Sequence, residues 1–188
     1  GCWIVFFRPE TVLFYRGEVQ LRTGMHPEVA LETFRHLARK YPGFKFLDTV
    51  EFRTAWILER RMKKYQPAIE AYQAFLRKYG PENVWADEAF TNLVRLFLDE
   101  LKQPREALEW IGRYRQRFDQ GQMLPPLALY EIRALLQVNR RPEAEKAFKQ
   151  AMAAFKGRSI ILYDNEDDFS MTIPFESAAA AIDNSLSP

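Results

Sequence analysis

The chain has 188 residues, of which 47% are apolar and 28% are charged, and its aromatic content is 14%. This composition excludes intrinsic disorder, because so many apolar and aromatic side chains can form a hydrophobic core. The single cysteine excludes an internal disulfide, and with only two histidines the sequence shows no zinc-binding spacing.

The formal net charge of +2 conceals an uneven distribution. Residues 1–156 hold 26 basic and 19 acidic side chains, a net charge of +7. Residues 157–188 hold one basic and six acidic side chains, a net charge of −5. We therefore predict a basic body followed by a separate acidic C-terminal segment, 157–188.

Residues 1–10 form an apolar N-terminal segment, in which CWIVFF (2–7) precedes Arg8 without a charge. Six apolar residues are too few to cross a bilayer, which needs about 20. The run could be the end of a membrane anchor, with Trp3 at the interface. It could instead be the lipidated start of a mature chain, with Cys2 as the lipidation site, or a segment packed on the first helix. The first two alternatives predict membrane contact through residues 2–7.

An apolar pattern recurs four times along the chain with a period of 37 to 39 residues. Each copy has an alanine followed by apolar residues at i+4, i+7 and i+11, which share one face of an α-helix. The copies are Ala30, Phe34, Leu37, Tyr41; Ala68, Tyr72, Phe75, Tyr79; Ala107, Ile111, Tyr114, Phe118; and Ala144, Phe148, Ala151, Phe155. A proline two or three residues earcheck before each alanine, as expected in a first helical turn, predicts helices that begin near 27, 66, 104 and 141.

Another segment of helical periodicity precedes each of these helices. The four segments are 11–23, 47–63, 86–101 and 125–138, and Gly- and Pro-containing breakers lie at 41–44, 79–83 and 121–126. The sequence thus predicts an all-α fold, a right-handed α-solenoid of about four helix pairs over 11–156. The predicted repeats are about 11–45, 46–83, 84–121 and 122–156.

These repeats resemble those of tetratricopeptide repeat (TPR) proteins. The residues that carry the resemblance are Gly17, Ala30, Phe34 and Pro42; Ala55, Tyr65, Ala68 and Tyr72; Leu93, Val94, Phe97 and Ala107; and Leu135, Ala144, Phe148 and Ala151. Two features depart from the family pattern. The period exceeds the usual 34 residues, and the small residue of the first helix is replaced by Val94 and Ile132 in the last two repeats.

Longer repeats with endings such as KYPG (40–43) are similar to the bacterial cell-envelope subset of the family. That subset includes the lipoprotein of the outer-membrane barrel-assembly machinery and the Tol-Pal coordinator. The resemblance implies a membrane-associated protein on the periplasmic side of a bacterial envelope, with a cytoplasmic location as the alternative. It also implies a non-enzymatic scaffold whose partners are other proteins, such as subunits of a membrane-associated complex.

In this family, first-helix side chains generally line a concave groove that binds partner segments. The groove candidates are Glu18, Arg22, Trp56, Arg60, Arg95, Asp99 and Arg133. We expect the four arginines to form a basic ladder suited to carboxylates, with Trp56 as an apolar anchor. In the alternative interpretation Trp56 is a core residue and the arginines are ordinary surface charges.

No catalytic motif is present, and the sequence predicts neither enzyme activity, nor a cofactor, a metal site or a small-molecule substrate. His26 and His36 have no second ligand at helical spacing. The acidic run DNEDD (164–168) resembles the start of a calcium loop but lacks its central Gly and distal Glu, which favours a solvated loop.

Two basic clusters suggest nucleic-acid association as an alternative function. They consist of Arg60, Arg61, Lys63 and Lys64, and of Arg113, Arg115 and Arg117. Acidic residues are interspersed among them and no stacking motif accompanies them, so solvated helix faces are the simpler interpretation.

The C-terminal segment breaks the repeat pattern. Two short β-type runs flank the acidic run, and SAAAAIDNS after Pro174 predicts a short helix. The segment is expected either to cap the last repeat or to bind a partner.

Overall fold

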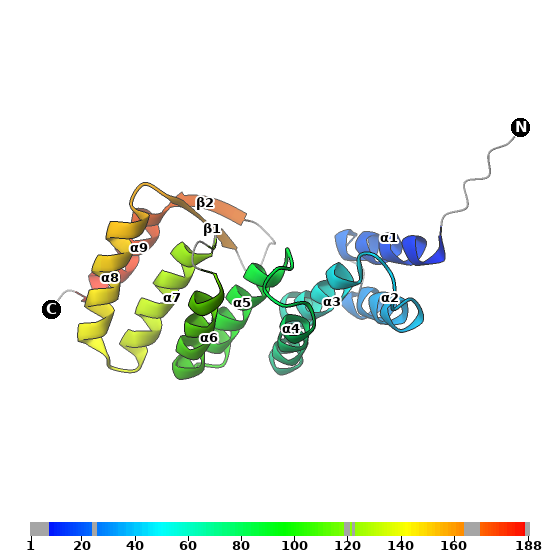
Figure 1. The fold of residues 1–188 in the computed structure, drawn as a ribbon, viewed down its shortest axis with the longest axis horizontal. Coiled ribbons are helices and arrows are strands. Elements are labelled where there is room, and N and C mark those ends of the chain that lie inside the picture. Colours follow the sequence, from blue (N-terminus) through cyan, green and yellow to red (C-terminus); the bar gives the residue numbers. More distant parts are fainter. Residues whose placement is uncertain (1–7, 24–25, 119–120, 122, 164–169, 187–188) are drawn as a thin grey trace, which may run out of the picture. The chain divides into compact units, whose positions relative to one another are not determined.

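The computed structural model describes residues 8–23, 26–118, 121, 123–163 and 170–186 (Figure 1). It divides into two compact units, Gly1–Gly80 and Pro81–Pro188. The first unit contains α1 (Pro9–Arg22), α2 (Pro27–Lys40), α3 (Leu47–Trp56) and α4 (Tyr65–Tyr79). A π-helical turn, η1 (Ile57–Arg61), continues α3.

The second unit begins with the same arrangement. It contains α5 (Ala86–Arg95), the π-helical turn η2 (Leu96–Glu100), α6 (Pro104–Arg117), α7 (Leu124–Gln137) and α8 (Arg141–Phe155). An antiparallel hairpin of β1 (Ser159–Tyr163) and β2 (Ser170–Pro174) follows, and then α9 (Phe175–Leu186). The second helices of the pairs begin at 27, 65, 104 and 141, within one residue of the predicted starts.

The repeated alanine and the residue at i+4 form the contact between the two helices of a pair. Ala30, Ala68, Ala107 and Ala144 are all fully buried, as are Phe34, Tyr72 and Ile111. In the first pair the helices approach most closely at Gly17, where an added Cβ would lie 2.6 Å from the Phe34 ring. The equivalent first-helix residues Ala55, Val94 and Ile132 are larger and are also fully buried.

The two π-helical turns explain part of the irregular period. The ten residues of α3 and the five of η1 exceed the 14 residues of α7 by one, and α5 with η2 does the same. A π-turn contains such an extra residue because its hydrogen bonds run from i+5 to i. Accordingly Met62 N–H donates to the Ile57 carbonyl and Leu101 N–H to the Leu96 carbonyl. Neither turn was predicted from the sequence.

The C-terminal segment is part of the core of the second unit. Ile160, Phe175, Ala179 and Ile182 are buried in one cluster with side chains of α7 and α8, including Ile132. Phe175 N–H donates to the Arg158 carbonyl at 2.8 Å, which fixes the start of α9 against the start of the hairpin. Figure 1 shows α9 beside α8, and the predicted helix after Pro174 is therefore present and packed.

Candidate partner-binding face

The predicted groove residues occupy two adjacent rows on the first helices of the pairs. Counted from the start of each helix, Glu18, Trp56, Arg95 and Arg133 are the tenth residues of α1, α3, α5 and α7. One turn later, Arg22, Arg60 and Asp99 are the fourteenth. We call these two rows the first-helix rows and describe them unit by unit.

In the first unit, Trp56 is half-buried between two arginines. The Arg53 and Arg61 guanidinium carbons lie 5.9 and 5.4 Å from the centre of its indole ring, distances that allow cation–π attraction. Arg53 Nε also lies 3.4 Å from Oε1 of Glu18 on α1. Trp56 is therefore not a core residue, and it presents part of an aromatic surface bordered by positive charge.

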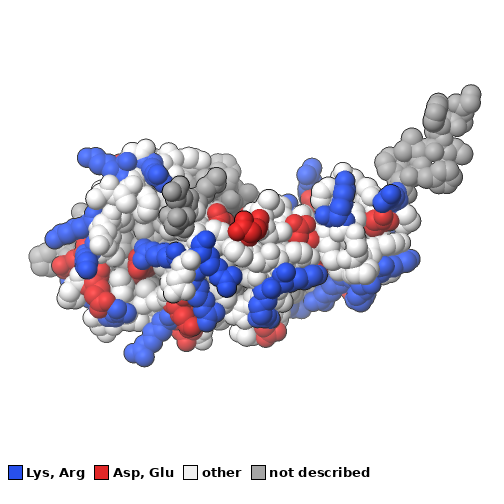
Figure 2. Space-filling view, viewed as in Figure 1, with Lys and Arg blue, Asp and Glu red and all other residues white. Residues whose placement is uncertain are grey.

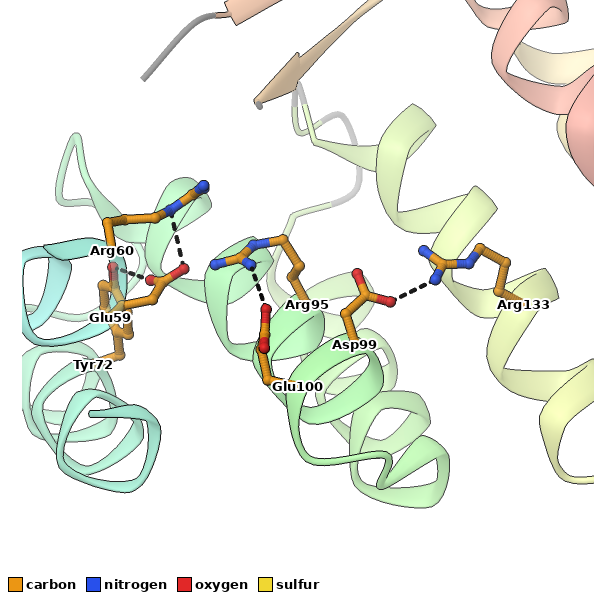
Figure 3. Close-up of polar contacts among 7 residues, drawn as sticks. All are labelled: Glu59, Arg60, Tyr72, Arg95, Asp99, Glu100 and Arg133. Carbon is orange, nitrogen blue, oxygen red and sulfur yellow. Dashed lines mark hydrogen bonds and ion pairs between the residues drawn. The ribbon is translucent and has the colours of Figure 1, made fainter. Parts of the chain in front are cut away.

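Arg60 lies against a buried carboxylate, as Figure 3 shows. Its Nε is 3.1 Å from Oε1 of Glu59, whose side chain is only 1% exposed. The other Glu59 oxygen accepts a hydrogen bond from the Tyr72 hydroxyl of α4 at 2.7 Å. With 10% of its side chain exposed, Arg60 stabilises the interior of the first unit and offers little surface to a partner.

In the second unit, Arg95 and Arg133 differ in exposure although they occupy the same position (Figure 3). The Arg95 side chain is 8% exposed, and its Nη1 lies 3.7 Å from Oε1 of Glu100. Burial lowers the pKa of the Arg95 guanidinium. The Arg133 side chain is 40% exposed, donates to the Asp99 carboxylate and lies over the Tyr130 ring. Arg133 is thus the more accessible cation of this pair.

The predicted single ladder of four arginines is wrong in its geometry. Arg22 and Arg60 belong to the fourteenth-residue row, where the third member is Asp99, an acid. Arg95 and Arg133 belong to the tenth-residue row with Glu18 and Trp56. A row with an acid in one repeat and a base in another favours ion pairs between helices, such as Arg133 with Asp99, over a continuous cationic surface.

The other basic clusters are largely paired with acids. Arg113 and Arg115 bind Glu109 and Glu131, the latter through two hydrogen bonds of 2.7 and 2.6 Å. Figure 2 shows acidic side chains among the basic ones on the visible face of the molecule. Such alternation is unlike the continuous basic path that phosphate binding uses.

The first unit also has a cavity that sequence reasoning missed. It has a volume of about 560 Å³ and lies among α2, α3 and α4. Its lining is Arg35, Ala38, Arg39, Glu51, Thr54, Ala71, Ala74, Phe75 and Lys78. Its charges are partly satisfied, because Lys78 bonds to Glu51 at 2.6 Å and Arg39 to Glu32 at 2.7 Å. The small residues Ala38, Ala71 and Ala74 were the available signal, since they leave space between neighbouring helices.

Within the part of the chain that the structure describes, no three His, Cys, Asp or Glu side chains are placed to hold a metal ion. His26 precedes α2 and His36 lies on it, and both are exposed. No helix among the described residues has the length and apolarity needed to cross a membrane. Cys2, the run 2–7 and the acidic run 164–168 lie outside the described residues.

Comparisons with known proteins support the TPR assignment of the fold. The tetratricopeptide repeat family model matches residues 49–80, the second repeat. A tetratricopeptide repeat protein from Parabacteroides merdae has a similar structure, with a TM-score of 0.65 and 17% identity over 79% of this chain and 54% of that chain. A MamA fragment from Desulfovibrio magneticus RS-1 gives a TM-score of 0.60 and 17% identity over 77% of this chain and 74% of that chain.

A MamA RS-1 double mutant gives a TM-score of 0.61 at the same identity and coverage as that fragment. No curated protein matches the chain by sequence. The chain spans about half the length of the Parabacteroides protein. The predicted all-α, TPR-like fold is confirmed, and TPR folds are generally protein-binding scaffolds.

Proposed function

We propose that this protein is a non-enzymatic scaffold that binds segments of partner proteins on its first-helix rows, within a membrane-associated assembly of the bacterial cell envelope. The TPR-like fold supports the general role, because such helix pairs commonly bind other proteins. The observation that carries the choice of surface is Trp56, a half-buried tryptophan bordered by Arg53 and Arg61.

This arrangement suits an apolar side chain that is accompanied by a carboxylate. Tryptophan and arginine are the residue types most often found at the energetic centres of protein interfaces. Arg61 is exposed, and Arg133 in the second unit is 40% exposed, so both can reach a partner. Arg60 and Arg95 have the supporting role of holding Glu59 and Glu100, because their side chains are largely buried.

Affinity capture with the full chain tests this proposal, using Trp56→Ala and Arg61→Glu as separate variants. The matched control is Trp110→Ala, because Trp110 on α6 is also half-buried and has Arg113 4.6 Å from its ring centre. We expect bound partners to be lost with both Trp56→Ala and Arg61→Glu and retained with Trp110→Ala.

An identical set of captured proteins from all three variants would remove the first-helix rows as the binding surface. The same preparations would test nucleic-acid association by filter binding across a salt series. Binding with a steep salt dependence that survives Trp56→Ala would favour the alternative function, because phosphate contacts release counterions.

A further inference from the structure

The outward face of α1 carries apolar side chains that no described element covers. Val12, Tyr15 and Val19 are 50, 60 and 56% exposed. They are spaced by three and four residues, so they lie on one stripe along the helix. Three exposed apolar residues in one stripe are unusual for a helix that begins a stack of repeats, because a terminal helix ordinarily has a polar outer face.

The same positions are buried in later first helices of each unit. Val12 and Val19 correspond to Val50 and Ile57 in the α3 segment, which α2 covers, and both are 0% exposed. In the second unit they correspond to Leu127 and Ala134 of α7, which α6 covers and which are at most 1% exposed. The stripe on α1 therefore has the character of a contact surface whose covering partner lies outside the described residues.

The charges around the stripe have one sign. Arg8, Arg16 and Arg22 are exposed, whereas the two acids of α1, Glu10 and Glu18, are only half-exposed. Glu18 is moreover engaged by Arg53 at 3.4 Å. The face consequently has an apolar centre, a tyrosine and a basic border.

This charge pattern disfavours a second copy of the chain as the partner. If two α1 stripes paired in antiparallel fashion about Tyr15, Arg8 of one copy would meet Arg22 of the other. If they paired in parallel, each arginine would meet its own counterpart. Both arrangements place like charges together, which costs free energy at an interface.

We propose that this α1 face lies against an anionic phospholipid surface. Arginine stems and tyrosine rings suit the boundary between headgroups and acyl chains, where their apolar parts are buried and their polar ends stay hydrated. Anionic headgroups attract basic side chains close to the surface. The lipid surface is favoured over an acidic protein helix because the sequence immediately before Arg8 is the apolar run CWIVFF. A bilayer can accept that run together with the stripe.

The inference deepens the membrane association of the proposed function and uses residues outside the proposed Trp56 site. The test is flotation of the full chain with vesicles of phosphatidylcholine alone, or of phosphatidylcholine with 30% phosphatidylglycerol. The variants are Val12→Ser/Val19→Ser and Arg8→Gln/Arg16→Gln. The controls are Val84→Ser, since Val84 is 81% exposed, and Arg117→Gln, which removes an exposed arginine from α6.

We expect binding to the anionic vesicles that weakens with salt. Removal of the two arginines should weaken it about 25-fold, which is about fivefold for each charge near the surface. The double serine variant should also lose binding, and both controls should bind as the wild type does. Circular dichroism on each variant checks that the helices remain folded.

Several outcomes would overturn the inference. They are no binding to either vesicle, equal binding to neutral and anionic vesicles, and unchanged binding by both α1 variants. Sedimentation that shows a dimer abolished by Val12→Ser/Val19→Ser would assign the face to a second copy instead. Loss of captured proteins with the α1 variants, without vesicle binding by the wild type, would assign it to a protein helix. The Trp56→Ala capture experiment is unaffected by any of these results.

Discussion

The Tyr72 hydroxyl donates to a Glu59 oxygen at 2.7 Å, and both side chains are buried at the contact between α3 and α4. Tyr72→Phe removes this donor and leaves a buried carboxylate with one hydrogen bond fewer. We expect it to lower the free energy of unfolding by about 1.5–3 kcal/mol. Tyr114→Phe is the matched control, because Tyr114 bonds to Asp87 at 3.2 Å in a half-buried contact. Its cost should be about 0.5–1.5 kcal/mol. Urea unfolding followed by circular dichroism measures both, and equal losses would contradict the assignment.

Gly17 and Gly112 are expected to respond in opposite directions to alanine. A Cβ at position 17 would lie 2.6 Å from the Phe34 ring, so Gly17→Ala should destabilise the protein by about 1–3 kcal/mol through overpacking. A Cβ at position 112 in α6 would meet nothing within 4 Å. There the higher helix propensity of alanine should stabilise the protein by about 0.5–1 kcal/mol. Unfolding midpoints that shift in the same direction would show that α1 and α2 are not packed this closely.

Phe175 should contribute strongly to stability although it belongs to the acidic C-terminal segment. It is 0% exposed and stacks edge-on against Phe155 of α8 at 5.5 Å. Phe175→Ala should cost about 3–5 kcal/mol, as for other large-to-small changes in a core. Phe46→Ala, at a position that is 40% exposed, should cost much less. Thermal unfolding compares the two, and a small effect at Phe175 would favour a segment that serves only to bind a partner.

Glu176 gives the end of the chain a defined acid sensitivity. Backbone N–H groups of its own residue and of Gly157 bond to its carboxylate and hold its pKa below the ordinary value of 4.5. A lowered folded-state pKa means that the stabilisation is complete above about pH 4.5 and disappears as the pH falls through the folded value. The stability difference between the wild type and Glu176→Gln should therefore shrink between about pH 6 and pH 3. Glu145→Gln on α8 matches the change in net charge. A difference that is the same at both pH values would contradict the contact.

The helix pairs could be predicted from the sequence because their signals are local. Pro27 and Pro104 begin their helices, and the alanine-to-aromatic spacing identifies the buried face. The hairpin and the last helix also follow from short runs around breakers. The π-turns could not be predicted, because a single extra residue within 37 to 39 leaves no residue type that marks it. Their positions depend on packing against the next helix.

The candidate surface was harder to predict than the fold, because exposure of a polar side chain depends on distant partners. Trp56 was correctly placed among the first-helix residues, but its two flanking arginines were not identified. The burial of Arg60 depends on Glu59 and that of Arg95 on its neighbours in the second unit. Leu98 and Ile111 occupy the places of Glu59 and Tyr72 in the third repeat and are both buried. No local pattern distinguishes such a polar exception from a solvated charge.

Three connections in the chain have equal length, since six residues separate α2 from α3, α4 from α5 and α6 from α7. Differences between repeats are instead absorbed inside the helices, chiefly at η1 and η2. Exchange of whole repeats at these connections should therefore preserve the entry angle of the following helix. Recombination within a first helix would have to respect the extra residue, because a mismatch there would rotate every later side chain by about 100°.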